Sequence, residues 1–264
     1  MRTGIVQTNI YSKSGILLLA KGEELTEEFL EQLRRIEIIE ATTLAELDRQ
    51  MALCWNKDKL KAKFTPIDSA FIETSNETVG DILFQSSGQP WLPALDALRK
   101  YVDWVYVHSV DVALISGILA GRLNFSAQEQ QEICLGALLH DVGKLRVPKE
   151  IIQKPGSLTQ QEMSLMQQHC ELGCEVLKDA GLPPHSLEIV LQHHERLDGT
   201  GYPYGLSEDK ISDYAKIVMV ADVLDAITSY RPYKDVGSMN IAFQELKGNS
   251  SKYDQNIVNL LIDL

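Results

Sequence analysis

Residues 215–227 read AKIVMVADVLDAI, and this stretch indicates both the fold class and the kind of site that the fold contains. Its residues are mostly apolar, which predicts a largely buried helix over residues 211–229. An aspartate inside such a helix, here Asp222, is costly unless its carboxylate is paired or bound to a metal ion. The stretch therefore predicts a helical core that contains a functional carboxylate.

The segments around this helix also have helical patterns. Strand-like alternation is absent from them, so the C-terminal two thirds of the chain is predicted to be an all-helical bundle. The expected helices are an apolar-rich one at 92–122, two that begin at the capping boxes Ser126/Glu129 and Thr159/Glu162, the second running toward Gly181, one at 184–195 after Pro183 and Pro184, and a last pair at 211–229 and 238–263.

The N-terminal residues form a separate unit by their pattern. GILLLA at 15–20 is a short apolar run, and ELTEEFLEQLRRIEII predicts a helix that Thr26 caps. The lysines at 57, 59, 61 and 63 are interpreted as a solvated helix face. The polar stretch QSSGQP at 85–90 predicts the boundary. We expect a small α+β regulatory or scaffold domain with a helical linker at 1–88, and a mainly α, helical-bundle catalytic domain at 89–264.

Composition limits the partners. The sequence has 264 residues, 25 Lys and Arg against 37 Asp and Glu, and a formal net charge of −12. This acidity disfavours polymeric nucleic acid as a partner. No uninterrupted apolar run approaches the roughly 18 residues of a spanning helix, so membrane insertion is not expected. The start MRTGIVQTNIYSKSG lacks the profile of a signal peptide, which favours a cytoplasmic location.

The four cysteines are too few and too scattered for a disulfide framework, which fits a reducing compartment. Cys170 and Cys174 are one helical turn apart and could ligate a metal ion together. Burial as small apolar side chains is the preferred interpretation.

Histidines and aspartates gather on the predicted helices. His140 and Asp141 close one helix, His193 and His194 lie near the end of another, and Asp222 lies in the apolar stretch. Imidazoles and a buried carboxylate are typical ligands of transition metals. Adjacent helical residues point about 100° apart, so each pair serves two ions more easily than one. We infer a dinuclear centre, in which a bridging water is activated for hydrolysis of a phosphodiester.

Two motifs match a known family. HDVGK at 140–144 resembles the signature of the HD superfamily of metal-dependent phosphohydrolases. HHERLDGTGYP at 193–203 resembles the second signature of the HD-GYP phosphodiesterases, and the flanking segments from about residue 95 to 264 agree. The resemblance implies an HD-type helical domain that hydrolyses cyclic di-GMP to linear pGpG, and further to GMP in some cases.

The resemblance also implies roles for individual residues. The first metal ion would be held by His108, His140, Asp141 and Asp222, and the second by Asp141, His169, His193 and His194. Asp141 and Lys144 would be catalytic, and Lys144, Arg231 and Lys234 would contact the phosphates. Trp104 stands where some members have a glutamate that holds a third ion, so two ions are expected. Iron or manganese is favoured, with nickel, cobalt or zinc as alternatives.

The DGTGYP loop at 198–203 has two interpretations. Gly201 allows a close backbone approach to a ligand, and Tyr202 offers a surface for a base, so a substrate-facing role is favoured. The alternative is a rigid turn, which Arg196 and Asp198 would hold by pairing with each other or with neighbouring helices.

Three functions remain open from sequence alone. The first is the hydrolysis of cyclic di-GMP in bacterial second-messenger signalling. The second is the hydrolysis of a related dinucleotide, cyclic GMP-AMP. The third is a catalytically silent receptor for cyclic dinucleotides, against which the full set of ligands argues. A homodimer or a signalling-protein partner is compatible with each of them.

Overall fold

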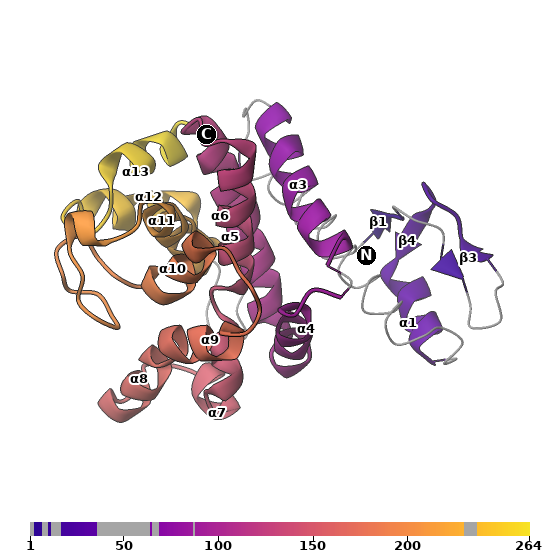
Figure 1. Cartoon of the computed structure of the whole chain (residues 1–264), viewed down its shortest axis with the longest axis horizontal. Coiled ribbons are helices and arrows are strands. Elements are labelled where there is room, and N and C mark those ends of the chain that lie inside the picture. Colours follow the sequence, from indigo (N-terminus) through magenta and orange to yellow (C-terminus); the bar gives the residue numbers. More distant parts are fainter. Residues whose placement is uncertain are drawn as a thin grey trace.

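The computed structural model describes residues 3–6, 10–11, 17–35, 64, 69–86, 88–229 and 237–264. The lysines at 57–63, Cys54 and the segment 230–236 with Arg231 and Lys234 lie outside these residues. Figure 1 shows the described elements, with the strands and α1 beside α3 at one end of the molecule.

In the described residues before α3 (Ser69–Phe84), short strands accompany helix α1. Strand β1 (Thr3–Ile5) pairs antiparallel with β4 (Glu24–Thr26), and β2 (Ile10–Tyr11) pairs antiparallel with β3 (Leu17–Leu19). Helix α1 (Glu27–Arg35) follows β4 directly, and the Thr26 hydroxyl accepts a hydrogen bond of 3.1 Å from the amide of Phe29. The buried apolar residues of the strands, of the segments beside them and of α1 form a separate hydrophobic cluster: Val6, Ile10, Leu19, Leu25 and Leu30.

Helices dominate the described residues from 69 onward, which confirms the predicted bundle. They are α3 (Ser69–Phe84), α4 (Leu92–Tyr101), α5 (Asp103–Arg122), α6 (Ala127–Leu139), the 3-10 helix η1 (Val142–Arg146), α7 (Lys149–Ile152), α8 (Gln160–Gln167), α9 (His169–Leu177), α10 (Pro184–Gln192), η2 (Glu208–Lys210), α11 (Asp213–Thr228), α12 (Met239–Gly248) and α13 (Gln255–Ile262). Among the described residues of this region, strand pairing is limited to one isolated bridge, Asp198 to Ser207.

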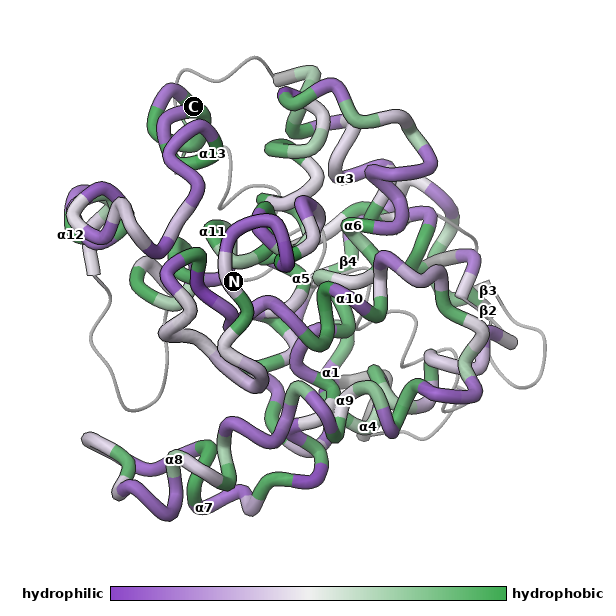
Figure 2. Tube along the Cα trace, turned by 60° about the vertical axis from the view of Figure 1, so that its left-hand side comes forward, coloured by the Kyte–Doolittle hydropathy of each residue, from purple (hydrophilic) through white to green (hydrophobic). Residues whose placement is uncertain are grey.

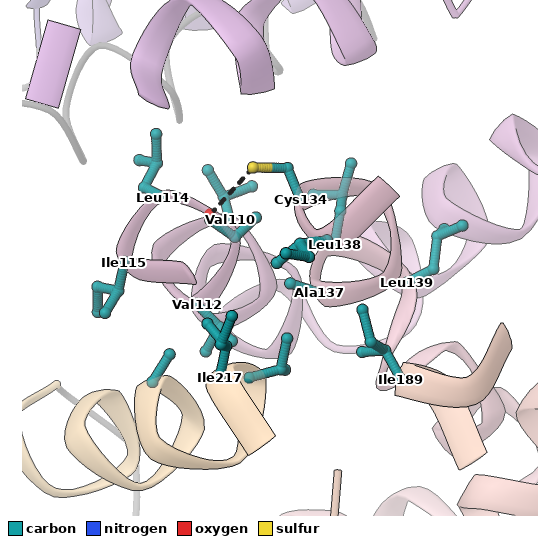
Figure 3. Packing of buried hydrophobic residues seen from close by; sticks show 14 of the residues in the cluster. Val110, Val112, Leu114, Ile115, Cys134, Ala137, Leu138, Leu139, Ile189 and Ile217 are labelled. Atoms are coloured by element: carbon teal, nitrogen blue, oxygen red, sulfur yellow. Dashed lines mark hydrogen bonds between the residues drawn. The ribbon is translucent and has the colours of Figure 1, made fainter. Parts of the chain in front are cut away.

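Helix α5 is the centre of the bundle, and α3, α4, α6, α11 and α13 pack around it. Helix α5 is long and apolar enough to cross a membrane, but 83% of its apolar 18-residue stretch is buried inside the protein. Figure 3 shows apolar side chains of α5 and α6 meeting those of the helices around them, such as Ile217 of α11 and Ile189 of α10. In Figure 2, hydrophilic and hydrophobic residues alternate along the outer helices α8, α12 and α13. Helix α5 is therefore the core helix of this bundle.

Three predicted helices are each divided in two. The helix expected at 92–122 breaks at the buried Val102, whose extended backbone (φ −146°, ψ 94°) separates α4 from α5. A turn at Gln168 divides the next into α8 and α9. The last, at 238–263, stops at Gly248, and the Asp254 side chain caps α13. Periodicity missed these breaks because the helices on both sides keep apolar faces toward one core.

The predicted capping boxes are confirmed. The Ser126 amide donates to the Glu129 carboxylate over 2.7 Å and the Glu129 amide donates back to the Ser126 hydroxyl over 3.3 Å, and Thr159 and Glu162 repeat both bonds.

Val79, Ile82 and Leu83 of α3 belong to the core of the bundle, although α3 precedes the predicted boundary at residue 88. The boundary itself stays a prediction.

Candidate metal centre

The fold brings the seven predicted metal ligands together in two adjoining groups. Asp141, His169, His193 and His194 form one group, and His108, His140 and Asp222 form the other. Within each group the candidate ligand atoms all lie within 4.8 Å of one another. We call the set with His108 the first group and the set with His169 the second group. Five helices and the residues at their ends contribute these side chains: α5, α6, α9, α10 and α11.

In the first group, His108 lies between two carboxylates. Its Nε2 atom is 3.0 Å from Oδ1 of Asp222 and 3.9 Å from Oδ2 of Asp141. The Nε2 atom of His140 is 3.3 Å from the same Asp141 oxygen, and the rings of His108 and His140 meet edge to face. These four side chains are at least 90% buried, so the first group together with Asp141 offers two imidazoles and two carboxylates in a water-poor setting.

In the second group, His169 faces the other Asp141 oxygen, Oδ1. Its Nε2 atom is 3.4 Å from Oδ1 of Asp141 and 3.2 Å from Nε2 of His193. His194 is less buried, and its Nδ1 atom lies 3.9 Å from Oδ2 of Asp222. Two imidazole nitrogens that face each other at 3.2 Å need a proton or a cation between them.

Asp141 joins the two groups because each of its oxygens faces one of them. Within the described part of the chain, its buried Oδ1 atom accepts no hydrogen bond. An unsatisfied buried carboxylate oxygen is costly in a folded protein unless a cation binds it. This orphaned atom shows that the residues fit a metal ion at the second group.

The imidazoles are already oriented as metal ligands. The Nδ1 atoms of His140 and His169 lie 2.6 and 2.7 Å from the carbonyl oxygens of Ala137 and Met166. That of His193 lies 3.1 Å from the carbonyl oxygens one turn earlier, at Ile189 and Val190. A carbonyl only accepts, so each Nδ1 donates a proton and each Nε2 carries the lone pair that faces the cluster.

The electrostatics of the site favour the forms that bind metals. Burial lowers the pKa of His169 to about 4 and the pKa values of His193 and His194 well below the usual range. Burial opposes the ionisation of Asp141, but His140 and Lys144 lower its pKa well below the usual range. Burial also opposes the ionisation of Asp222, but the hydrogen bond and charge of His108 lower the pKa of Asp222 well below the usual range. Neutral imidazoles beside ionised carboxylates are the states that metal binding requires.

Lys144 and Trp104 also bear on the predicted chemistry. Lys144 belongs to η1, and its Nζ atom lies 2.6 Å from Oδ2 of Asp141, which places one cation at the edge of the cluster. Trp104 occupies the position one helical turn before His108. Among the described residues, no third group of potential metal ligands accompanies the two groups above.

The GTGYP residues pack on the end of α10. The buried Glu195 carboxylate accepts hydrogen bonds from the amides of Tyr204 (2.8 Å) and Leu206 (2.9 Å). Gly201 lies so close that an added β-carbon would stand 2.4 Å from the Cα atom of Glu195. The ring of Tyr202 lies 4.7 Å from that of His194, at the edge of the second group. The contacts of Gly201 and Tyr202 with substrate stay predictions.

Arg196 and Asp198 stabilise this loop separately. The Arg196 guanidinium donates to the carbonyl oxygens of His193 and Glu195, whereas Asp198 accepts from the amide and hydroxyl of Thr200.

The described cysteines, Cys134, Cys170 and Cys174, are free, and neither ligand group includes them. Burial raises the pKa of Cys174 to about 11 and so favours its thiol form.

Sequence reasoning missed Glu195 and Asp225, which are two of the buried carboxylates among the described residues. Glu195 accepts hydrogen bonds from Tyr204 and Leu206, just after GTGYP, and Asp225 lies 2.7 Å from Nδ1 of His108. The signal for Asp225 was available, because it lies in the same apolar stretch as Asp222 and its burial is equally costly. Glu195 gave no such signal, since its partners are backbone amides.

Comparison with known proteins gives the class. The sequence model of the HD domain family matches residues 94–257. The chain belongs to the HD domain family, as the HDVGK motif indicated.

Among its relatives is a protein of Thermotoga maritima named cyclic di-GMP phosphodiesterase. It is 40% identical over 177 residues, which are 66% of this chain and 48% of that protein. A Vibrio cholerae protein named 3'3'-cGAMP-specific phosphodiesterase 3 is 31% identical over 225 residues, which are 85% of this chain and 44% of the relative. The chain thus spans less than half the length of either relative.

A solved structure shares the fold along nearly the whole chain. Bd1817, described as an HDG"Y"P protein from Bdellovibrio bacteriovorus, aligns with a TM-score of 0.56 and 21% identity. The alignment covers 98% of this chain and 94% of Bd1817.

Proposed function

We propose that this chain is a phosphodiesterase that opens cyclic di-GMP to linear pGpG with two divalent metal ions. One observation carries the proposal: Asp141 turns its two oxygens toward two groups of imidazole and carboxylate ligands, and its Oδ1 atom lacks a hydrogen bond within the described part of the chain. When bound, two such ions supply an activated water and neutralise charge on the attacking and leaving oxygens.

The chain's own residues have distinct tasks in this proposal. His108, His140 and Asp222 hold the first ion, His169, His193 and His194 hold the second, and Asp141 bridges the two. Lys144, already beside Asp141, binds a non-bridging phosphate oxygen. Tyr202, at the edge of the second group, contacts a base of the substrate. Gly201, Arg231 and Lys234 complete the proposed substrate contacts.

Iron and manganese are the metal ions we propose first, because a shell of imidazoles and carboxylates accepts several first-row ions. Nickel, cobalt and zinc fit the same ligands. We propose that the enzyme works in the cytoplasm, with residues 1–88 as a regulatory domain for a homodimer or a signalling partner.

Cyclic GMP-AMP is the alternative substrate. The similarity to the Vibrio cholerae protein, which extends over 85% of this chain, favours it. A silent receptor is disfavoured, because all seven candidate ligands and Lys144 lie together.

The test combines metal analysis with turnover. Protein purified without oxygen is analysed for iron, manganese, nickel, cobalt and zinc, then incubated with cyclic di-GMP or cyclic GMP-AMP, and products are followed to pGpG and GMP. We expect two ions per chain and faster cleavage of cyclic di-GMP. Two bound ions with no cleavage of cyclic di-GMP would refute the proposal, and cleavage of cyclic GMP-AMP alone would favour the alternative.

A further inference from the structure

Asp225 is a buried carboxylate directly behind a candidate metal ligand. It lies on α11, is fully buried, and places its Oδ2 atom 2.7 Å from Nδ1 of His108 on α5. This atom of His108 points away from the ligand cluster, whereas its Nε2 atom points toward Asp222. Asp225 therefore contacts His108 on the side opposite to the metal position.

His108 differs in this respect from three other histidines of the site. The Nδ1 atoms of His140, His169 and His193 face neutral backbone carbonyls of the preceding turn. His108 faces a carboxylate from a different helix. Hydrogen bonds to ionised acceptors are roughly twice as strong as neutral ones, and a carboxylate partner makes an imidazole a better metal ligand.

The contact fixes which nitrogen of His108 binds the metal ion. Asp225 lies outside both ligand groups and accepts from Nδ1, so Nε2, which faces the groups, is the atom left to bind an ion. The Nε2 atom lies 3.0 Å from Oδ1 of Asp222. Two ligands about 2.1 Å from one ion, at an angle near a right angle, are separated by roughly 3 Å. The spacing of His108 and Asp222 is therefore that of neighbouring ligands of one ion.

Asp225 is itself held in place. The Ser229 hydroxyl donates to its other oxygen, Oδ1, and the Ser229 amide donates to its backbone carbonyl. Asp225 follows Asp222 by three residues, so both side chains lie on the same face of α11. One helix face thus supplies a ligand of the first group and the carboxylate that orients His108, the ligand beside it.

We propose that Asp225 is a positioning residue that makes the first group the tighter of the two metal sites. The inference rests on the proposed function only in requiring that the two groups bind divalent ions. The second group contains His169 and His193, which carbonyls orient, and it lacks a carboxylate contact of this kind among the described residues. The two ions accordingly bind in order, first at His108, His140 and Asp222.

The test is a metal titration of the full chain, which needs no turnover. Metal-free protein is titrated with Co²⁺ by calorimetry and by the visible absorption of bound cobalt. Wild-type protein should bind in two steps. Asp225→Asn should weaken the tighter step by about 10- to 100-fold and leave the weaker step unchanged. His194→Gln should instead weaken the weaker step, which assigns each step to its group.

Two further variants separate positioning from stability. Ser75→Ala removes another buried hydrogen bond to α5, a 2.7 Å bond to the Leu114 carbonyl, and should leave both affinities unchanged. Ser229→Ala leaves Asp225 in place without one partner, and should weaken only the tighter step, by less than Asp225→Asn does. It serves as the test if Asp225→Asn fails to fold.

The outcomes are decisive. Unchanged affinities in Asp225→Asn, or in Ser229→Ala if the first variant does not fold, would overturn the inference. Equal weakening of both steps would overturn it as well. The proposed function fails separately, if wild-type protein binds two ions and cleaves no cyclic dinucleotide.

Discussion

Gly143 lies against the backbone of His169. A β-carbon built on Gly143 would stand 1.9 Å from the carbonyl oxygen of His169 and 2.5 Å from the amide nitrogen of Gly173. The 3-10 helix that follows Asp141 therefore packs directly on the start of α9. This contact sets the distance between Asp141, which both groups share, and His169, a ligand of the second group.

Gly143→Ala should displace α9 and damage the second group. Overpacking of this kind costs about 1–3 kcal/mol of unfolding free energy, and more when backbone must move. We expect a lower thermal midpoint and the loss of one of two bound ions. Denaturation and metal analysis measure both. Gly248→Ala is the matched control, since a β-carbon there has open space and should change neither quantity.

Glu195→Gln should loosen the segment that follows GTGYP, at Tyr204 and Leu206. The amide group would turn an N–H toward the amide of Tyr204 or Leu206, leaving a buried donor without an acceptor, at a cost of about 1–3 kcal/mol. The midpoint of thermal unfolding and the turnover rate should both fall. Glu175→Gln changes an exposed glutamate and should leave stability within about 0.5 kcal/mol. A stable, fully active Glu195→Gln would show that these two bonds are dispensable.

The contributions of the Tyr202 ring and of its hydroxyl to substrate binding can be tested separately. Its ring lies beside that of His194, and stacking of a base on an aromatic ring contributes about 1–3 kcal/mol. Tyr202→Ala should therefore raise KM for cyclic di-GMP by about tenfold or more. Tyr202→Phe keeps the ring and should leave KM near the wild-type value. If both variants raise KM equally, the hydroxyl and not the ring contacts the substrate.

Asp141→Ala should abolish metal binding and activity together. Because each oxygen of Asp141 faces one group, both sites lose a ligand. Turnover should fall by more than about a hundredfold, since even the partners of metal ligands contribute up to that factor. Elemental analysis and the dinucleotide assay are run on the same sample. Asp179→Ala, at an exposed position, is the control. Persistent turnover in Asp141→Ala would exclude the two-metal mechanism.

Removal of the metal ions should lower the thermal stability of the chain. An ion that binds only the folded state stabilises it by about 2.7 kcal/mol at a hundred times its dissociation constant. Chelator treatment should lower the thermal midpoint, and added Mn²⁺ should restore it. Asp141→Ala should show neither shift, and an equal shift in that variant would mean that the ions bind elsewhere.

Much of the bundle was predictable because its signals are local. The capping boxes at Ser126 and Thr159 each occupy four consecutive residues, and the structure has both. The apolar pattern likewise predicted a helical region, but it did not mark the breaks at Val102 and Gln168. Apolar faces continue through these breaks, so only the packing of each half against the core reveals them.

The sequence by itself determined the class of the fold, because helix periodicity and caps are properties of neighbouring residues, and its resemblance to a known family implied the list of candidate metal ligands. The tertiary structure alone decided that Asp225 stands behind His108, that Glu195 accepts from the amides of Tyr204 and Leu206, and that Gly143 contacts α9. These contacts join helices and loops that the chain separates by up to 117 positions. Packing of the whole bundle sets them, and no spacing within one segment encodes them.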